Sequence, residues 1–415
     1  MELSKRLLSG AAAGVIALMA TATAVSAEEI KLWTLTFAND SANKAWQKVV
    51  SDYEAANPGT TIRIENRGTD EHKAAMRVAA GSDQGPDIYF MWAGLGLGGE
   101  FVKAGLSLPL DKYYKQYGWG DRFLPSAAAF ADLYPGGKHG VPSSFKGEAI
   151  YYNKKLFEQA GITAEPATYD ELVAAAEKLK AAGTPGITFG GTVNWHLMRL
   201  MDVLLETKCG AEKHDALMAM TADWTKEACA ADAFGELGKW TSNYTLSPFM
   251  GIDQAQSFNL FIAGRAAMML EGDWLVQQIS ENGNLDDYGI FPFPTGTNRL
   301  YGFAEYNYIS TKSPNPDAAA KFLDYFTSTP VQQAVLGAIS TTSVNKDVKY
   351  ENPRPLDAEW QEIFKKYSTV YMNGDQAFPL DVTTEYFRVI NDVASGNIDA
   401  PTAVQQMQSF IAKRS

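Results

Sequence analysis

Trp92 stands at the end of a short apolar run, directly before a group of closely spaced glycines. The stretch 86–99 reads PDIYFMWAGLGLGG, with the spacing G-x-G-x-x-G at Gly94, Gly96 and Gly99. After a strand, this spacing is typical of a loop that holds the pyrophosphate of a dinucleotide. The stretch therefore predicts either a nucleotide site at the glycines or a different site that receives the Trp92 side chain.

The surrounding sequence argues against a dinucleotide. The fingerprint normally opens the first strand–helix unit, whereas here it follows the third predicted strand, and no acidic residue ends a strand about 20 residues further on. With 35 glycines in the chain, chance matches to the spacing are expected. We predict no cofactor. The glycines are expected to let the backbone run close to another group, and Trp92 to be displayed at the carboxyl end of its strand.

Three further tryptophans lie where strands end or helices begin. Trp33 ends the first predicted strand, Trp274 follows a buried strand, and Trp195 begins a helix on the side away from its apolar stripe. The charged residues beside them are Asp70, Glu71, Lys146, Glu148, Glu271, Asp273 and Glu305. Aromatic faces stack on the C–H face of a sugar ring, and carboxylates and amines bind its hydroxyls. The combination predicts a carbohydrate site, and a core role for each tryptophan alone is the competing interpretation.

Motifs for common catalytic and metal sites are missing from the sequence. The four histidines form no zinc-binding spacing, and neither G-x-S-x-G nor a calcium loop closed by glutamate is present. A glycosidase needs only two carboxylates about 5 to 10 Å apart, and 48 acidic residues offer many pairs. We predict binding without turnover and without a metal, and a glycoside-active enzyme stays open as an alternative.

The N-terminal residues predict export. Lys5 and Arg6 precede an apolar stretch, and Val25-Ser26-Ala27 supplies the small residues of a cleavage site. Residues 1–27 are therefore expected to form a signal peptide, cleaved after Ala27 to leave a periplasmic chain. The acidic balance, 48 acidic against 36 basic residues, disfavours nucleic acid and anionic lipid as partners.

Cysteine usage and the order of predicted elements indicate the fold. Cys209 and Cys229 predict a disulfide, because an even pair in an exported protein is usually bonded. Strand and helix patterns alternate from Glu29 onward, which is typical of an α/β fold with a mostly parallel sheet flanked by helices. The length is sufficient for two lobes with separate cores.

The order and spacing of several segments resemble the extracellular solute-binding proteins of ABC importers, in the sugar-binding group that includes maltose-binding protein. The matching segments are PDIYFMWA, GVPSSFKGEAIYYNKKLFEQAGI, FIAGRAAMMLEGDW, FPFPTG, ISTKSPNPDAAAKFLDYF and FRVINDVASGNIDAPTAVQQMQSFI. The resemblance implies a two-lobed periplasmic-binding-protein fold, each lobe a mostly parallel sheet flanked by helices. It implies discontinuous lobes, 28–143 with 304–342 and 144–303 with 343–415, joined by about three crossings.

The resemblance also implies which residues face the cleft. Trp92 and Trp274 match aromatic residues that stack on sugar in the family, whereas Lys146 replaces an acidic cleft residue of maltose-binding protein. Loops that usually face the cleft hold Phe37, Asp70, Trp195, Glu305, Tyr306 and Arg354. Thr383 stands close to where that relative places a third stacking tryptophan, which favours a short ligand.

The function implied is capture of a mono- or short oligosaccharide, glycoside or polyol by a monomer, and its presentation to the membrane permease. Closure of the lobes would bend the chain near 140–147, 301–306 and 340–345. A binder of an anionic sugar derivative, a phosphate or sulfonate, is one alternative, and it would use Lys146, Arg354 or the turn 190–192 before a helix. A secreted glycoside-active enzyme is the other.

Overall fold

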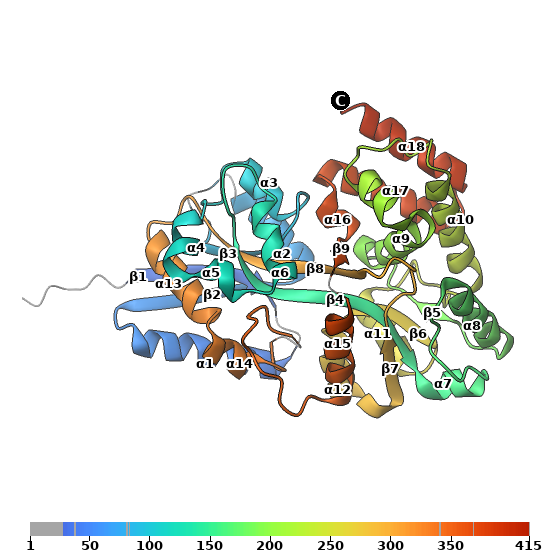
Figure 1. The fold of residues 1–415 in the computed structure, drawn as a ribbon, viewed down its shortest axis with the longest axis horizontal. Coiled ribbons are helices and arrows are strands. Elements are labelled where there is room, and N and C mark those ends of the chain that lie inside the picture. The colour runs from blue at the N-terminus through green and yellow to red at the C-terminus, as the bar shows by residue number, and fades with distance from the viewer. Residues whose placement is uncertain are drawn as a thin grey trace, which may run out of the picture.

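The computed structural model describes residues 28–36, 39–79, 82, 84–339, 342–367 and 369–414. Two lobes lie side by side, and one nine-stranded sheet runs through both (Figure 1). The strands are β1 (Glu28–Leu35), β2 (Thr60–Arg67), β3 (Ile88–Trp92), β4 (Val141–Asn153), β5 (Ile187–Thr188), β6 (Met268–Gly272), β7 (Tyr288–Phe291), β8 (Leu300–Ile309) and β9 (Val370–Tyr371). The two-lobed α/β fold expected from the sequence is confirmed.

Helices cover the sheet in both lobes (Figure 1). The first lobe holds α1 (Asp40–Ala56), α2 (Thr69–Ala79), α3 (Gly98–Lys103), α4 (Asp111–Tyr117), α5 (Trp119–Arg122), α6 (Pro125–Ala128), α13 (Pro316–Phe326) and α14 (Thr329–Val335). The second lobe holds α7 (Lys154–Gln159), α8 (Tyr169–Ala181), α9 (Asn194–Met218), α10 (Ala228–Asn243), α11 (Gln254–Ile262), α12 (Leu275–Asn282), α15 (Pro355–Lys366), α16 (Gly374–Ala377), α17 (Leu380–Ala394) and α18 (Ala400–Ala412).

Strand pairing is parallel at the flanks of the sheet and antiparallel in its middle. β1 pairs in parallel with β2 and β3, and β5 pairs in parallel with β6. β8 pairs antiparallel with β3 and β4, and β4 pairs antiparallel with β6 and β7. The expectation of mostly parallel strands therefore holds at the flanks. The long strands that link the lobes run antiparallel to β3, β6, β7 and each other, and only the short β9 pairs in parallel with β8.

The two lobes have separate hydrophobic cores. β4 passes from the first core to the second between Phe145 and Ile150, and β8 returns within residues 301–303. A third link lies between Val344 in the first core and Leu356 in the second lobe. We keep the lobe limits named above as a proposal, which these changes of core support. The sequence predicted the third crossing at 340–345, and we propose that the link extends as far as Leu356.

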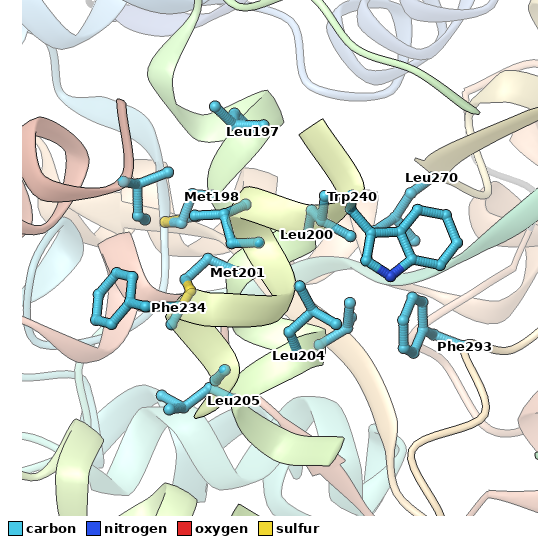
Figure 2. Packing of buried hydrophobic residues seen from close by; sticks show 14 of the residues in the cluster. Leu197, Met198, Leu200, Met201, Leu204, Leu205, Phe234, Trp240, Leu270 and Phe293 are labelled. Carbon is cyan, nitrogen blue, oxygen red and sulfur yellow. The ribbon is translucent and has the colours of Figure 1, made fainter. Parts of the chain in front are cut away.

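Helix α9 is surrounded by other elements (Figure 2). Its apolar residues cluster with Phe234 and Trp240 of α10, Leu270 of β6 and Phe293. The sequence predicted one apolar stripe, but every residue from 196 to 206 is buried. The polar side is buried too because its charged residues form ion pairs and hydrogen bonds inside the lobe.

Residues 1–27, the predicted signal peptide, lie outside the described residues. Among the helices that are described, none has the length and apolar character needed to cross a bilayer.

Cys209 and Cys229 form the predicted disulfide, which ties the middle of α9 to the first turn of α10. The Cα atoms are 5.0 Å apart, and 20 positions separate the two cysteines in sequence. Because α9 and α10 pack against each other in the second-lobe core, the bond fixes a pair of helices that the core already joins.

Joint replacement Cys209→Ser with Cys229→Ser is expected to lower the free energy of unfolding by about 3 kcal/mol, because the bond restricts the unfolded chain. Urea unfolding followed by far-UV circular dichroism measures the loss. Dithiothreitol should lower the stability of the wild type to the same extent and leave the double variant unchanged. A double variant as stable as the oxidised wild type contradicts the prediction.

Candidate functional site

A cavity of about 400 Å³ lies between the two lobes. First-lobe residues that line it include Thr34, Asn39, Thr69, Lys73, Phe90 and Trp92. Second-lobe residues include Trp195, Arg199, Gln254, Trp274, Arg354, Asn373 and Gln376. The linking strands β4 and β8 add Ser143, Ser144, Lys146, Phe303, Glu305 and Asn307. The volume is in the range of small-molecule sites, and both lobes contribute to one site.

Three neighbouring strands place a row of side chains on the cavity side of the sheet. Trp92 of β3 lies opposite Glu305 of β8, which lies opposite Ser144 of β4. Directly opposed residues of paired strands share a face, so these side chains stand together. The Ser144 hydroxyl donates a hydrogen bond to the Glu305 carboxylate. An irregularity in the register beside Ser144 brings Ser143 to the cavity as well.

Lys146 follows Ser144 along the same face of β4 and lines the cavity. Its Nζ lies 3.7 Å from Oδ1 of the buried Asp273. Burial raises the pKa of Asp273 to about 6, and the Lys146 ammonium opposes that rise. The Lys146 charge is therefore shared with a carboxylate of the protein.

Arg199 of α9 is the buried cation of the second lobe. Its Nε pairs with Glu148, and its Nη1 lies 2.6 Å from Oε2 of Glu271. Glu148 also accepts a 2.8 Å hydrogen bond from Nδ2 of Asn373, and Gln254 donates to Glu271. Burial raises the pKa of Glu148 to about 7, against the opposing effect of the Arg199 charge.

Trp195 and Trp274 flank Arg199. Its Cζ lies 4.6 Å from the centre of the Trp195 ring and 5.1 Å from that of Trp274. Trp274 also lies on Gly272, where a Cβ atom would meet its ring at 1.9 Å. Cation–π attraction and the glycine therefore hold two flat aromatic surfaces at the cavity.

The other cations that line the described cavity also have carboxylate partners. Lys73 Nζ lies 3.8 Å from Oδ2 of Asp375 and 4.9 Å from the centre of the Trp92 ring. Arg354 pairs with Asp357 through a 2.5 Å contact and donates to Gln277 at 2.6 Å. Acidic groups around the cavity therefore balance its positive charges.

Asp202 anchors the turn that contains α16 to the second lobe. Its Oδ2 accepts hydrogen bonds from the Gly374 amide at 2.8 Å and from the Tyr301 hydroxyl at 2.6 Å. Its Oδ1 accepts one from the Tyr386 hydroxyl at 2.8 Å. These bonds hold the residues on either side of Gly374 at the edge of the cavity.

Asn373 and Gln376 of this turn line the cavity and carry buried hydrogen-bond acceptors. The side chains are 5% and 2% exposed. Asn373 Oδ1 and Gln376 Oε1 have no hydrogen-bond partner within the part of the chain that the structure describes. A buried acceptor without a donor costs free energy, so a ligand hydroxyl or N–H group that reached either atom would be bound favourably.

The structure brings many of the predicted site residues together. Those that line the cavity are Trp92, Lys146, Trp195, Trp274, Glu305 and Arg354. Glu148, Glu271 and Asp273 lie behind the lining, where they pair with Arg199 and Lys146. Their predicted contact with ligand is therefore better described as support of the residues that line the cavity.

Three predicted residues lie away from the cavity lining. Trp33 is half-buried under Arg67, 4.1 Å from its ring centre, because the strand pleat turns Thr34 to the cavity instead. Tyr306 is fully buried in the first-lobe core and donates to the carbonyl of Ala127. Asp70 is exposed in the first turn of α2. Phe37 lies outside the described residues.

Sequence reasoning missed Arg199 and the α16 turn. Arg199, Asp202 and Glu206 share one face of a helix, at spacings of three and four within an otherwise apolar segment. That pattern could have identified a buried polar layer. Asn373 and Gln376 carry no comparable signal. Thr383 is buried in α17, where its hydroxyl donates to the Phe378 carbonyl.

Comparisons with known proteins agree with this architecture. The family model described as bacterial extracellular solute-binding protein matches residues 39–333. A binding protein of Brucella abortus (strain 2308) is 28% identical over 326 residues, covering 75% of this chain and 74% of the relative. The maltotriose-binding protein of Pyrococcus abyssi (strain GE5 / Orsay) is 26% identical over 296 residues, 69% of this chain and 60% of the relative. A solved chitin oligosaccharide binding protein shares the fold, with a TM-score of 0.84 and 24% identity over 94% of this chain and 99% of that one.

Arg199→Met is expected to lower the free energy of unfolding by about 3–5 kcal/mol, because it leaves Glu148 and Glu271 buried without their cation. Urea unfolding followed by circular dichroism measures the change. Arg388→Met is the matched control, since its surface pairs with Glu385 and Asp392 are each worth below about 1 kcal/mol. Equal losses in the two variants would count against the structural role of Arg199.

Glu148→Gln tests the raised pKa of Glu148. Between about pH 4.5 and pH 7 the folded chain keeps a proton on Glu148 that the unfolded chain has released. Stability from this group therefore falls as the pH rises through that window, by up to roughly 3 kcal/mol. Chemical unfolding at several pH values should show a smaller loss for E148Q than for the wild type. Glu158→Gln, on the exposed side of α7, should follow the wild type, and an E148Q curve parallel to the wild type refutes the raised pKa.

Proposed function

We propose that this chain, which belongs to the family of bacterial extracellular solute-binding proteins, captures a neutral carbohydrate between its lobes and presents it to an ABC-importer permease. Family membership makes the chain a binding protein and not an enzyme. The ligand we propose is a mono- or short oligosaccharide, glycoside or polyol, in line with the 400 Å³ cavity.

The observation that carries the proposal is the pairing of aromatic planes with hydrogen-bonding groups around one cavity. Trp92 comes from the first lobe, and Trp195 and Trp274 come from the second. Such rings stack on the C–H faces of sugar rings, while hydroxyl groups can donate to Asn373, Gln376 and carboxylate oxygens. The maltotriose-binding relative supports a saccharide as the ligand class.

The charge distribution supports a neutral ligand over an anionic one. Lys146 and Arg354, the cations that an anionic sugar would need, are paired with Asp273 and Asp357. The turn 190–192 packs against residues 250–254, with a Cβ at Gly190 reaching Asp253 backbone atoms at 2.3 Å. An anion would have to displace protein carboxylates, which the cavity does not favour.

Ligand capture is proposed to couple to closure of the lobes. The ligand would contact Trp92 on one lobe and Trp274 on the other, and contacts to the second lobe exist only in the closed form. β4, β8 and the link from Val344 to Leu356 would bend during closure. The proposal includes export, cleavage after Ala27, a periplasmic location and a monomeric chain, and the permease would recognise the closed form.

Native mass spectrometry of protein purified from its own periplasm tests the ligand class. An intact neutral saccharide supports the proposal, and turnover of a bound oligosaccharide would favour the glycoside-active enzyme instead. A phosphorylated or sulfonated solute, or an affinity that falls steeply as salt rises, would favour the anionic alternative. Equal small-angle scattering radii with and without a tight ligand would refute closure.

Trp92→Ala and Trp274→Ala are each expected to weaken saccharide binding at least tenfold, about 1.4 kcal/mol, because each removes an aromatic surface at the cavity. Isothermal titration calorimetry with the co-purified saccharide measures the change. Trp33→Ala is the matched control and should bind as the wild type, since Trp33 lies under Arg67 away from the lining. Equal losses in all three variants would argue against direct stacking.

A further inference from the structure

The turn Gly94–Gly96 of the first lobe touches the α16 turn of the second lobe directly. The Gly96 amide donates a 3.0 Å hydrogen bond to the Gln376 carbonyl. Figure 1 shows α3, which follows the glycine turn, facing α16 across the gap between the lobes. The backbone of one lobe thus bonds to the backbone of the other beside the cavity.

Gly96 has no room for a side chain in this arrangement. A Cβ atom there would lie 1.9 Å from the Phe378 carbonyl oxygen and 2.4 Å from that of Asp375. The φ angle of Gly96 lies outside the left-handed region, so its own backbone conformation would accept alanine. Glycine is required at position 96 because carbonyl groups of the second lobe leave no room for a side chain. A Cβ at Gly94 would likewise meet the Gln376 carbonyl oxygen at 2.5 Å, although Gly94 also has a φ of +131°.

Two charged residues of the first lobe reach the same segment of the second. Lys73 Nζ lies 3.8 Å from Oδ2 of Asp375. Burial raises the pKa of Glu100, and the Arg77 charge together with the nearby Leu380 backbone amide opposes that rise. The contact between the lobes therefore extends from Lys73 through the glycines to Glu100 of α3.

The segment held by this contact also carries the unpaired acceptors of the cavity. Gln376 accepts from Gly96 through its backbone carbonyl, and its side chain, which carries the unpaired Oε1, belongs to the cavity lining. Asn373 lies three residues earlier and belongs to the same Asp202-anchored turn. The position of the glycine turn therefore determines where these acceptors stand relative to Trp92 and the first-lobe side of the cavity.

We infer that Gly94 and Gly96 are positioning residues for ligand binding: they let the α16 turn dock on the first lobe and so set Asn373 and Gln376 against the ligand in the closed form. The inference rests on the proposed function, because it concerns the closed form that captures the solute. It assigns the glycines a role through Gln376 and not through any contact of their own with ligand.

Gly96→Ala tests the inference, with Gly120→Ala as the matched control. A Cβ at Gly120, in α5 of the same lobe, meets nothing within 4 Å, and its φ also permits alanine. Isothermal titration calorimetry against maltose, cellobiose and xylobiose, together with any co-purified saccharide, gives affinities. Small-angle X-ray scattering gives the radius of gyration with and without the saccharide that the wild type binds.

We expect G96A to bind at least tenfold more weakly than the wild type and to stay at the ligand-free radius at saccharide concentrations that compact the wild type. Its urea unfolding without ligand should match the wild type, and G120A should be unchanged in all three measurements. A G96A protein with wild-type affinity and compaction overturns the inference. A wild type that binds none of the saccharides overturns the proposed function, and this inference with it.

Glu100→Ala is the second variant, because it removes a contact between the lobes without adding bulk. Glu100 is not among the residues that line the cavity. If G96A does not fold, a threefold or greater loss of affinity in E100A supports the docking contact. Wild-type affinity in E100A would then overturn the inference.

Discussion

The buried guanidinium of Arg199 is the constraint on which the second-lobe side of the cavity depends. A buried cation must keep its carboxylate partners, and here they come from two strands. Glu148 of β4 lies opposite Gly272 of β6, one position from Glu271, so the register of one strand pair fixes both carboxylates. α9 must therefore pack with its Arg199 side toward these two carboxylates. The Trp195 and Trp274 rings both contact the same guanidinium.

The strands that carry these charges are also the strands that link the lobes. β4 holds Phe145 in the first core and Ile150 in the second, with Lys146 and Glu148 between them. Gly147 lies opposite Gly302 at this crossing, and neither has a left-handed φ. A Cβ at Gly147 would meet the Trp360 ring at 2.7 Å. Close packing against α15, and not an unusual backbone angle, therefore explains glycine at the crossing.

Regular elements could be predicted from the sequence wherever a local signal was strong. Thr168 caps α8 as its pattern predicts, and the apolar run before Trp92 forms β3. The sequence did not show which residues of β1 face the cavity: Thr34 lines it, whereas Trp33 lies under Arg67. α16 has only four residues, too few to show a helical period of apolar residues. Its position depends on the hydrogen bond from the Gly374 amide to Asp202, which lies far away in sequence. Such tertiary placement leaves no trace in local sequence.

The contact between the lobes beside α16 is small, and its size determines how closure and ligand binding can be coupled. One backbone hydrogen bond contributes about 0.5–1.5 kcal/mol. The Lys73–Asp375 ion pair is largely buried, so the cost of removing both charges from water offsets much of its attraction. Contacts of this size leave the proposed open and closed forms near balance. A ligand that binds the closed form a few kcal/mol more tightly then shifts most molecules to it. A much larger contact would close the lobes without ligand and would oppose release to a permease.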